Sequence, residues 1–148
     1  DGWEHTCGDL LTIHDYSSSG ESLRKHFASV DSVLALAPGG RSVFADGYHY
    51  LGQPILVTEF GGVKYAPASD VAHSWGYCEA NSPEAYAKKV AELTRALLDS
   101  PLVQGYCYTQ LTDVETEENG LLTYDRGLKI PLETIRSINE NRYIGTTL

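Results

Sequence analysis

The sequence contains no methionine and only three cysteines in 148 residues. Residue 1 is Asp, so we expect the chain to begin at a cut and not at a translation start. The cysteines, Cys7, Cys78 and Cys107, are widely spaced and odd in number, and no two of them form a Cys-x-x-Cys pair. This pattern favours free thiols over a zinc site or a full disulfide framework.

Long apolar runs and clustered positive charges are also absent. No run approaches the ~20 apolar residues that a membrane-spanning helix needs, so no membrane segment is expected. The 11 Lys and Arg residues are scattered and are outnumbered by 20 acidic residues, which gives a formal net charge of -9. Nucleic-acid binding needs clustered Lys and Arg. The sequence therefore argues against a nucleic-acid partner, and it favours neutral sugars or other uncharged ligands.

Metal-binding patterns are missing as well. An acidic stretch contains Asp113, Glu115, Glu117 and Glu118, but it lacks the glycine and the residue order of a calcium loop. Acidic loops of this kind are usually solvated, and we interpret this one in that way. The sequence predicts neither a metal nor another cofactor.

The residues that are present alternate between strand and helix patterns. Short apolar runs predict strands at Asp9–Ile13, Ile55–Thr58 and Val103–Tyr108. Helical spacing predicts a helix through Leu23, Phe27, Val30 and Leu34, a second through Tyr86, Val90, Leu93 and Leu97, and a last one through Pro131, Leu132, Ile135 and Ile138. The second helix has Ser82 as its expected N-cap and Pro83 at its first position. Residues 142–148 are expected to form a tail.

Three strand–helix units in series predict parallel strands joined by right-handed crossovers. Three parallel strands leave two open edges, so the chain is either the core of a small doubly wound domain or a sector of a larger barrel. The segment from Phe60 to Asn81 has neither helical nor strand periodicity. Loops of this length are usually functional. Its length favours the barrel sector.

The strand at Ile55–Val57, opened by Pro54, ends in a carboxylate at Glu59. In β/α barrels the carboxyl ends of the strands carry the chemistry, so Glu59 is a candidate catalytic residue. Gly61 and Gly62 are expected to let the backbone turn away and keep the space beside the carboxylate open. The alternative is a structural glutamate paired with a neighbouring Lys or Arg.

Five segments, in the correct order, resemble the C-terminal part of the catalytic barrel of glycoside hydrolase family two, which contains β-galactosidases, β-glucuronidases and β-mannosidases. They are Asp1–Glu4, Thr12–Tyr16, Pro54–Gly62, Gly105–Asp113 and Asn119–Arg126. The resemblance spans nearly the whole chain. It implies an α/β fold in which residues 1–148 supply strands six to eight of a (β/α)8 TIM barrel that is truncated at its N-terminus.

The resemblance implies that Glu59 is the nucleophile of a retaining mechanism, which proceeds through a covalent glycosyl-enzyme. The partner acid/base in this family belongs to an Asn-Glu pair at the end of strand four. The only Asn-Glu pair here is Asn139-Glu140, which lies late in the last expected helix. The acid/base is therefore expected outside this chain, and the fragment is expected to be inactive by itself.

The resemblance also assigns supporting residues. It implies that the hydroxyl of Tyr16 hydrogen-bonds the nucleophile, the alternative being an ordinary aromatic that packs on a loop. His14 either contacts sugar hydroxyls or is a hydrogen-bonded core residue, and Asp15 has no clear role. Trp3 and Trp75 are candidates for stacking on a sugar ring, although a single Trp often anchors packing instead.

At strand eight the family often places a Trp on the floor of the sugar site. Tyr108, Thr109 and Gln110 occupy the nearest positions here, so Tyr108 is the expected substrate contact and the sugar cannot be named.

Three functions remain open at this stage. The first is a fragment of a retaining β-glycosidase, with a β-linked carbohydrate as its substrate and with the rest of the barrel or further copies of the chain covering its edges. The second is a free-standing or inactive carbohydrate-binding α/β domain that uses Glu59 only structurally. The third is a retaining barrel glycosidase of another family, since a strand-seven glutamate and a strand-six tyrosine are shared among many of them.

Overall fold

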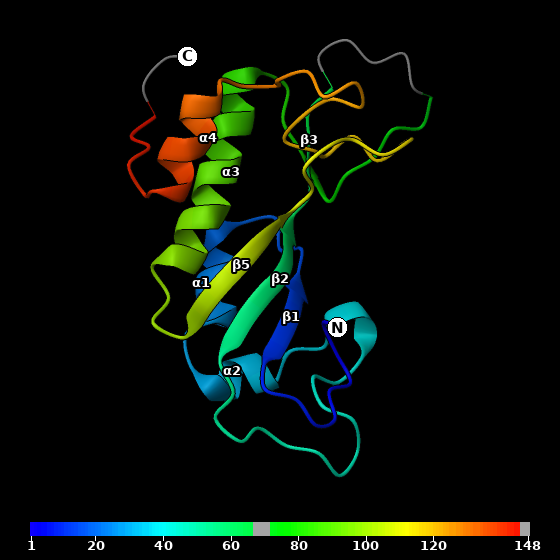
Figure 1. Ribbon diagram of the computed structural model, residues 1–148, viewed down its shortest axis with the longest axis vertical. Helices are drawn as coiled ribbons and strands as arrows, with labels where there is room; N and C mark the ends of the chain where they lie inside the picture. The colour runs from blue at the N-terminus through cyan, green and yellow to red at the C-terminus, as the bar shows by residue number, and fades with distance from the viewer. Residues whose placement is uncertain (67–71, 146–148) are drawn as a thin grey trace.

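The computed structural model describes residues 1–66 and 72–145, and it has a mixed α/β fold. Its main sheet contains β1 (Leu11–Asp15), β2 (Ile55–Gly61) and β5 (Val103–Thr109), in the order β1-β2-β5 (Figure 1). Both pairings are parallel. This confirms the adjacency and the direction expected of the three strands. A second parallel sheet has only β3 (Val63–Lys64) and β4 (Cys78–Glu79).

The prediction of one continuous helix from Leu23 to Leu34 is wrong. The segment forms two short helices, α1 (Gly20–His26) and α2 (Val30–Leu34). The hydroxyl of Ser29 accepts a hydrogen bond from the backbone N–H of Ser32 at 3.1 Å and so starts the second helix. An N-cap serine of this kind satisfies an otherwise unpaired backbone donor and competes with helix continuation. A short 3-10 turn, η1 (Pro38–Gly40), follows.

The other two helices agree with the sequence pattern. In α3 (Pro83–Leu98) the hydroxyl of Ser82 accepts a hydrogen bond from the backbone N–H of Ala85 at 3.1 Å, as expected of an N-cap. Pro83 occupies the first turn, and the predicted apolar stripe of Tyr86, Val90, Leu93 and Leu97 is buried. The last helix is α4 (Leu132–Asn139). Residues 146–148 of the expected tail lie outside the described residues.

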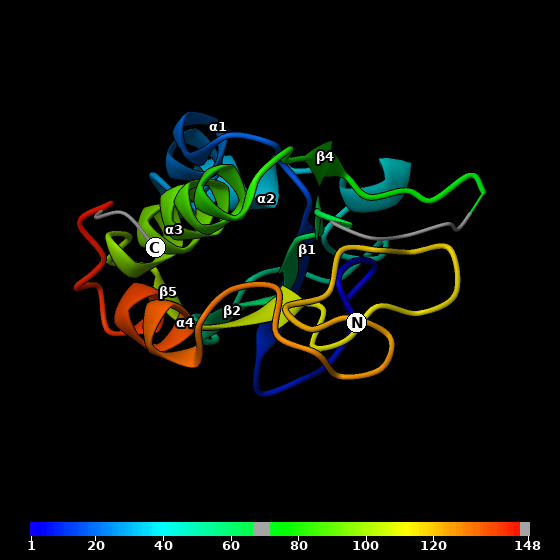
Figure 2. The ribbon, with the colours of Figure 1, turned by 90° about the horizontal axis from the view of Figure 1, so that it is seen from above.

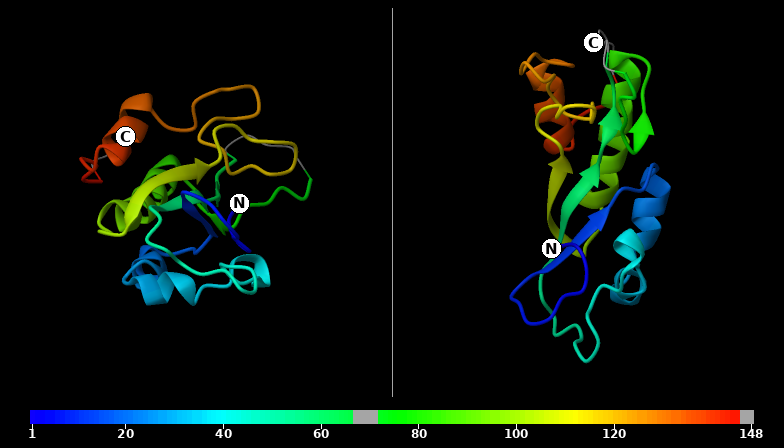
Figure 3. Two further views of the ribbon diagram at one scale, coloured as in Figure 1. Left: turned by 60° about the horizontal axis from the view of Figure 1, so that its bottom comes forward. Right: turned by 90° about the vertical axis from the view of Figure 1, so that its right-hand side faces the viewer.

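The core lies between one face of the sheet and the helices. Figure 2 shows α1, α2 and α3 together on one side of the strands. Leu11, Ile13 and Val57 are fully buried on this side, and Ile55 is nearly so. The residues between them in the strands, Thr12, His14 and Leu56, are only half-buried. The sheet therefore presents a second, more accessible face, and the views of Figure 3 show no helix of the described chain across it.

The strands end at one edge of the main sheet, which positions the candidate residues. The first strand lies two residues later than expected, so it includes His14 and Asp15, and Tyr16 follows its last residue directly. The middle strand carries Glu59 near its end, and Thr109 ends β5. In residues 1–66 and 72–145, no helix has both the length and the apolar composition needed to cross a bilayer.

Candidate active site

Glu59 and Tyr16 meet at the carboxyl ends of β1 and β2. The phenolic hydroxyl of Tyr16 donates a hydrogen bond to Oε2 of Glu59 at 2.7 Å. This confirms the approach within hydrogen-bond distance that the sequence predicted. The side chain of Glu59 is 40% exposed, so the carboxylate is anchored on one side and remains accessible.

His14 is the second partner of Glu59. The two residues are opposite each other in the β1–β2 register, and Nδ1 of His14 lies 3.1 Å from Oε2 of Glu59. Its Nε2 lies 3.5 Å from Oδ2 of Asp1, without a hydrogen bond. Among the described residues, the imidazole of His14 lies within 4 Å of the Glu59 carboxylate, and no Lys or Arg nitrogen does. The alternative of a structural Glu–Lys or Glu–Arg pair at this strand end is therefore wrong.

The surroundings of Tyr16 keep its hydroxyl protonated. Burial raises the pKa of this phenol far above its ordinary value, and the hydrogen bond to the Glu59 carboxylate raises it further, whereas the Thr109 side chain lowers it. A protonated phenol is a donor, so Tyr16 can stabilise the negative charge of Glu59 at any moderate pH.

A cavity of about 600 Å³ opens beside these residues. Its lining includes the half-buried Trp3, whose ring meets the His14 imidazole edge-on at 5.2 Å. The other residues that line it are His14, Asp15, Tyr16, His26, Glu59, Tyr77 and residues 35–39. The structure thus brings four of the six candidate residues to one cavity, namely Trp3, His14, Tyr16 and Glu59.

Trp75 and Tyr108 do not line this cavity. Trp75 is 42% exposed and packs edge-on against Tyr77 at 5.5 Å. The hydroxyl of Tyr108 accepts a hydrogen bond from the backbone N–H of Val63 at 3.1 Å and donates one to the carbonyl oxygen of Asn119 at 3.3 Å. Tyr108 therefore ties β5 to two neighbouring segments.

The space beside the Glu59 carboxylate is open, as expected, because Glu59 lines the cavity, whereas the positions directly beside Gly61 and Gly62 are filled by aromatic rings. A Cβ atom on Gly61 would lie 2.3 Å from the Tyr108 ring, and one on Gly62 would lie 2.4 Å from the Tyr77 ring. Both glycines have positive φ, which favours glycine. Their role is to admit two aromatic rings close to the backbone.

Two features of the cavity were missed by the sequence interpretation. Tyr77 lies in the segment from Phe60 to Asn81, which was predicted to be functional only as a whole, yet its ring stacks on that of Tyr16. Asp15, which had no clear role, accepts hydrogen bonds from the Ser17 backbone N–H at 2.9 Å and from Nδ1 of His26 at 2.7 Å. No local pattern links Asp15 to His26, because the pairing depends on how α1 folds back along β1.

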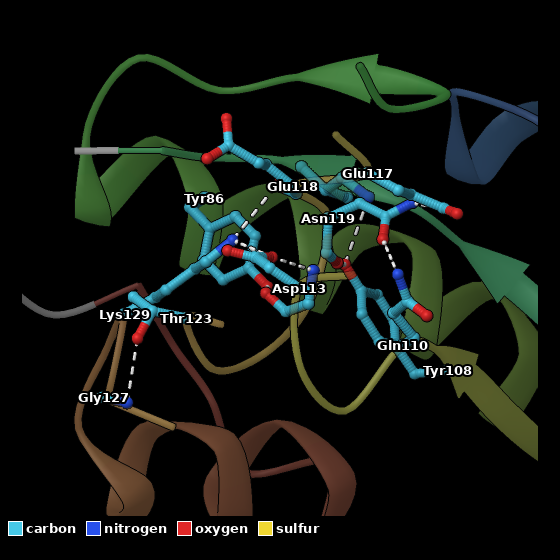
Figure 4. Close-up of polar contacts among 12 residues, drawn as sticks. Tyr86, Tyr108, Gln110, Asp113, Glu117, Glu118, Asn119, Thr123, Gly127 and Lys129 are labelled. Atoms are coloured by element: carbon cyan, nitrogen blue, oxygen red, sulfur yellow. Dashed lines mark hydrogen bonds and ion pairs between the residues drawn. The ribbon is translucent and has the colours of Figure 1, made fainter. Parts of the chain in front are cut away.

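The acidic stretch after β5 is not simply solvated, which corrects the sequence interpretation. Asp113 and Glu118 are each only 6% exposed. Nζ of Lys129 lies 2.7 Å from Oδ1 of Asp113 and donates a hydrogen bond to the carbonyl oxygen of Glu118 at 3.0 Å (Figure 4). A buried carboxylate needs such a partner, because an isolated charge in the interior is costly.

The described chain contains no group of three or more His, Cys, Asp or Glu side chains that can hold a metal ion. The three cysteines are free, as the sequence predicted, and Cys7 and Cys107 are exposed.

Solved structures of three carbohydrate-processing enzymes share this fold. A GH2 β-galacturonidase from Eisenbergiella tayi bound to galacturonate is 15% identical over 90% of this chain, with a TM-score of 0.59. A β-glucuronidase from Bifidobacterium dentium is 18% identical over 90%, with a TM-score of 0.52. An exo-β-agarase is 13% identical over 91%, with a TM-score of 0.55.

The chain spans only 24%, 20% and 16% of those three proteins, respectively. No protein-family model and no curated protein matches the sequence. At these identities the likeness shows the fold alone, and the fold is that of a part of each enzyme.

Proposed function

We propose that residues 1–148 are the nucleophile-bearing, C-terminal sector of the TIM barrel of a retaining β-glycosidase, with β1, β2 and β5 as strands six, seven and eight. The observation that carries the proposal is the 2.7 Å hydrogen bond from Tyr16 to Glu59 at the carboxyl ends of parallel strands. The likeness to parts of a β-galacturonidase and a β-glucuronidase supports it.

In this proposal Glu59 attacks the anomeric carbon of a β-linked sugar. Its carboxylate oxygen forms a bond to that carbon, and the aglycone oxygen leaves with the bonding electron pair. Water then hydrolyses the glycosyl ester. Tyr16 donates a hydrogen bond to Oε2, and Nδ1 of His14 lies 3.1 Å from the same oxygen, so in this proposal the second oxygen, Oε1, attacks the sugar.

In this proposal the second carboxyl group is supplied by sequence outside this chain. Asn139 and Glu140 lie at the end of α4, where Glu140 pairs with Arg136 and Arg142. Glu140 is therefore not the proposed acid/base, which lies at the end of a strand in this family. Without that acid, we expect the isolated chain not to hydrolyse unactivated glycosides.

The remaining candidates take different roles. Trp3 and His14 line the cavity and are the proposed sugar contacts on this chain. Trp75 and Tyr108 lie outside the cavity lining, so in this proposal they support its wall through Tyr77 and Gly61 and do not contact the innermost sugar.

The likeness to an exo-β-agarase supports one variant of the proposal, a retaining barrel glycosidase of a family other than family two. The free-standing carbohydrate-binding domain is the alternative of another class. It requires that Glu59 has only a structural role and forms no covalent bond with a sugar.

Covalent trapping tests the proposal. The 148-residue chain is incubated with 2,4-dinitrophenyl 2-deoxy-2-fluoro-β-glycosides, whose leaving group departs without acid help, and the adduct is located by peptide mass spectrometry. We expect slow labelling of Glu59, and no labelling of Glu59→Gln. Sugar binding without any adduct would favour the carbohydrate-binding domain, and an adduct that persists in Glu59→Gln would reject the nucleophile assignment.

A further inference from the structure

Tyr77 lies directly against the proposed hydrogen-bond donor of the nucleophile. Its ring is stacked on that of Tyr16, with the ring centroids 3.6 Å apart and the planes 10° from parallel. The hydroxyl of Tyr16 in turn reaches Glu59. One face of the Tyr16 ring is therefore covered by Tyr77, and this contact restricts the directions in which the Tyr16 hydroxyl can point.

The backbone fixes the position of Tyr77. Its N–H donates a hydrogen bond to the carbonyl oxygen of Gly62 at 2.9 Å, just before the β3–β4 pairing that brings Val63 opposite Cys78. The ring fills the space at Gly62 that a Cβ would otherwise occupy. Because Gly62 follows the end of β2, this arrangement sets Tyr77 at a fixed distance from Glu59 on the same strand.

A second contact holds Tyr77 from the side of the loops after β5. The Trp75 ring packs edge-on against it. Trp75 is itself held by two backbone hydrogen bonds, from its N–H to the carbonyl oxygen of Thr116 at 2.8 Å and from the N–H of Glu118 to its carbonyl oxygen at 3.1 Å. Glu118 is anchored by buried Lys129. The ring of Tyr77 is therefore packed between the anchored Trp75 and Tyr16.

We propose that Tyr77 is a positioning residue for the nucleophile: its ring clamps the Tyr16 phenol so that the hydroxyl stays aimed at Oε2 of Glu59. This inference rests on the proposed function for its catalytic meaning, but the contact itself can be tested without a sugar. The proposal assigns this role to the ring of Tyr77, because stacking needs only the aromatic face, and Tyr77→Phe tests it against a role for the hydroxyl.

The test measures how fast a water-soluble carbodiimide, with glycine ethyl ester as the amine, modifies Glu59 of the 148-residue chain at pH 6. Peptide mass spectrometry gives the rate for each carboxyl group. Removing the hydrogen bond in Tyr16→Phe should speed modification of Glu59 by about tenfold, the lower end expected for a hydrogen bond to a charged group. We expect Tyr77→Leu to give the same increase.

Two further variants separate clamping from general packing. Tyr77→Phe keeps the ring, so in this variant Glu59 should be modified at the wild-type rate. The double variant Tyr16→Phe/Tyr77→Leu should be no faster than Tyr16→Phe alone, because both changes remove the same hydrogen bond. Tyr124→Leu, at a tyrosine that is 61% exposed, is the matched control and should leave the rate unchanged.

Several results would overturn the inference. These are a wild-type rate at Glu59 in Tyr77→Leu, an additive double variant, or a Tyr77→Phe rate equal to that of Tyr77→Leu. An equal rise at the buried Asp113 would show unfolding instead of a lost clamp, and would also reject it. Failure of fluoroglycoside trapping alongside the expected carbodiimide rates would reject the proposed function and leave the clamp intact.

Discussion

Lys129 and Asp113 form an ion pair in the interior, with Nζ and Oδ1 2.7 Å apart and side chains that are 0% and 6% exposed. The same carboxylate oxygen accepts a hydrogen bond from the Gly120 N–H at 2.8 Å. Burial lowers the pKa of Lys129, and the Asp113 carboxylate opposes that shift. Since the segments 110–120 and 127–130 meet at this pair, it connects the loops after β5 to one another.

Breaking this pair should destabilise the fold strongly. Asp113→Ala leaves an uncompensated buried ammonium group, which costs about 3 to 5 kcal/mol. The free energy of unfolding, measured with urea, checks this. Glu21→Ala, which removes an exposed partner of Lys25, is the control and should change it little. The double variant Asp113→Leu/Lys129→Met should recover much of the loss, and equal destabilisation by the single and double changes would contradict the argument.

Stability should fall above pH 10 in a manner that depends on Tyr86. Burial raises the pKa of this phenol above its ordinary value of 10.0, and its hydroxyl donates to the carbonyl oxygen of Gly120 at 2.9 Å. The folded state then keeps a proton that the unfolded state releases. This contribution is complete below pH 10 and is lost as the pH rises toward the folded-state pKa.

The measurement is urea unfolding at several pH values above 10. Each tyrosine of this kind contributes a slope of about 1.4 kcal/mol per pH unit. We expect Tyr86→Phe to reduce the slope of unfolding free energy against pH by the contribution of one tyrosine. Tyr124→Phe, at an exposed site, should leave this slope unaltered. An unchanged slope in Tyr86→Phe would contradict the assignment.

Alanine at Gly61 should be far less tolerated than alanine at Gly47. Both glycines have positive φ, so both changes carry a backbone penalty of about 1 to 2 kcal/mol. A Cβ at Gly47 meets nothing within 4 Å, whereas one at Gly61 collides with the Tyr108 ring. Overpacking adds about 1 to 3 kcal/mol. Thermal unfolding of the two variants compares them directly, and equal losses would show that the ring moves aside freely.

Tyr16→Phe should slow the covalent labelling of Glu59 without preventing it. Tyr16 aims the attacking carboxylate at the anomeric carbon, and loss of this orientation should reduce the labelling rate about 10- to 100-fold, even though the freed carboxylate reacts faster with a carbodiimide. Time courses with the activated fluoroglycoside provide the measurement, with Tyr48→Phe as a control at an exposed tyrosine outside the cavity lining. A faster or unaltered reaction in Tyr16→Phe would remove Tyr16 from the proposed mechanism.

The open edges of the main sheet predict association. Within residues 1–66 and 72–145, β1 and β5 each pair only with β2 in this sheet. An unpaired strand edge presents free backbone N–H and C=O groups that can pair with another strand. We therefore expect the chain to associate with the rest of a barrel or with further copies of itself. Light scattering tests this for the isolated chain. A stable compact monomer, with Leu11, Ile55 and Val57 buried within the single chain, would favour a self-contained domain.

The sequence by itself determined the local elements with a strong periodic or capping signal. The helix from Pro83 was predictable because Ser82, Pro83 and the apolar stripe all agree. The three strands of the main sheet were predictable from short apolar runs, although β1 lies two residues later than predicted. The meeting of Glu59 with Tyr16 was predicted from the family resemblance, and it agrees with the rule that adjacent parallel strands end at the same edge of the sheet. The break between α1 and α2 was missed, since Ser29 caps a new helix within a continuous apolar pattern.

Only the tertiary structure decided the contacts between segments that are distant in sequence. Tyr77 reaches Tyr16 across 61 residues because β3 and β4 pair, and the acidic stretch is buried because Lys129 folds back onto Asp113. The same folding fills the space at Gly61 and Gly62 with aromatic rings. A sequence pattern reports the periodicity of one segment, whereas side-chain packing and the desolvation of charges depend on which other segments arrive beside it.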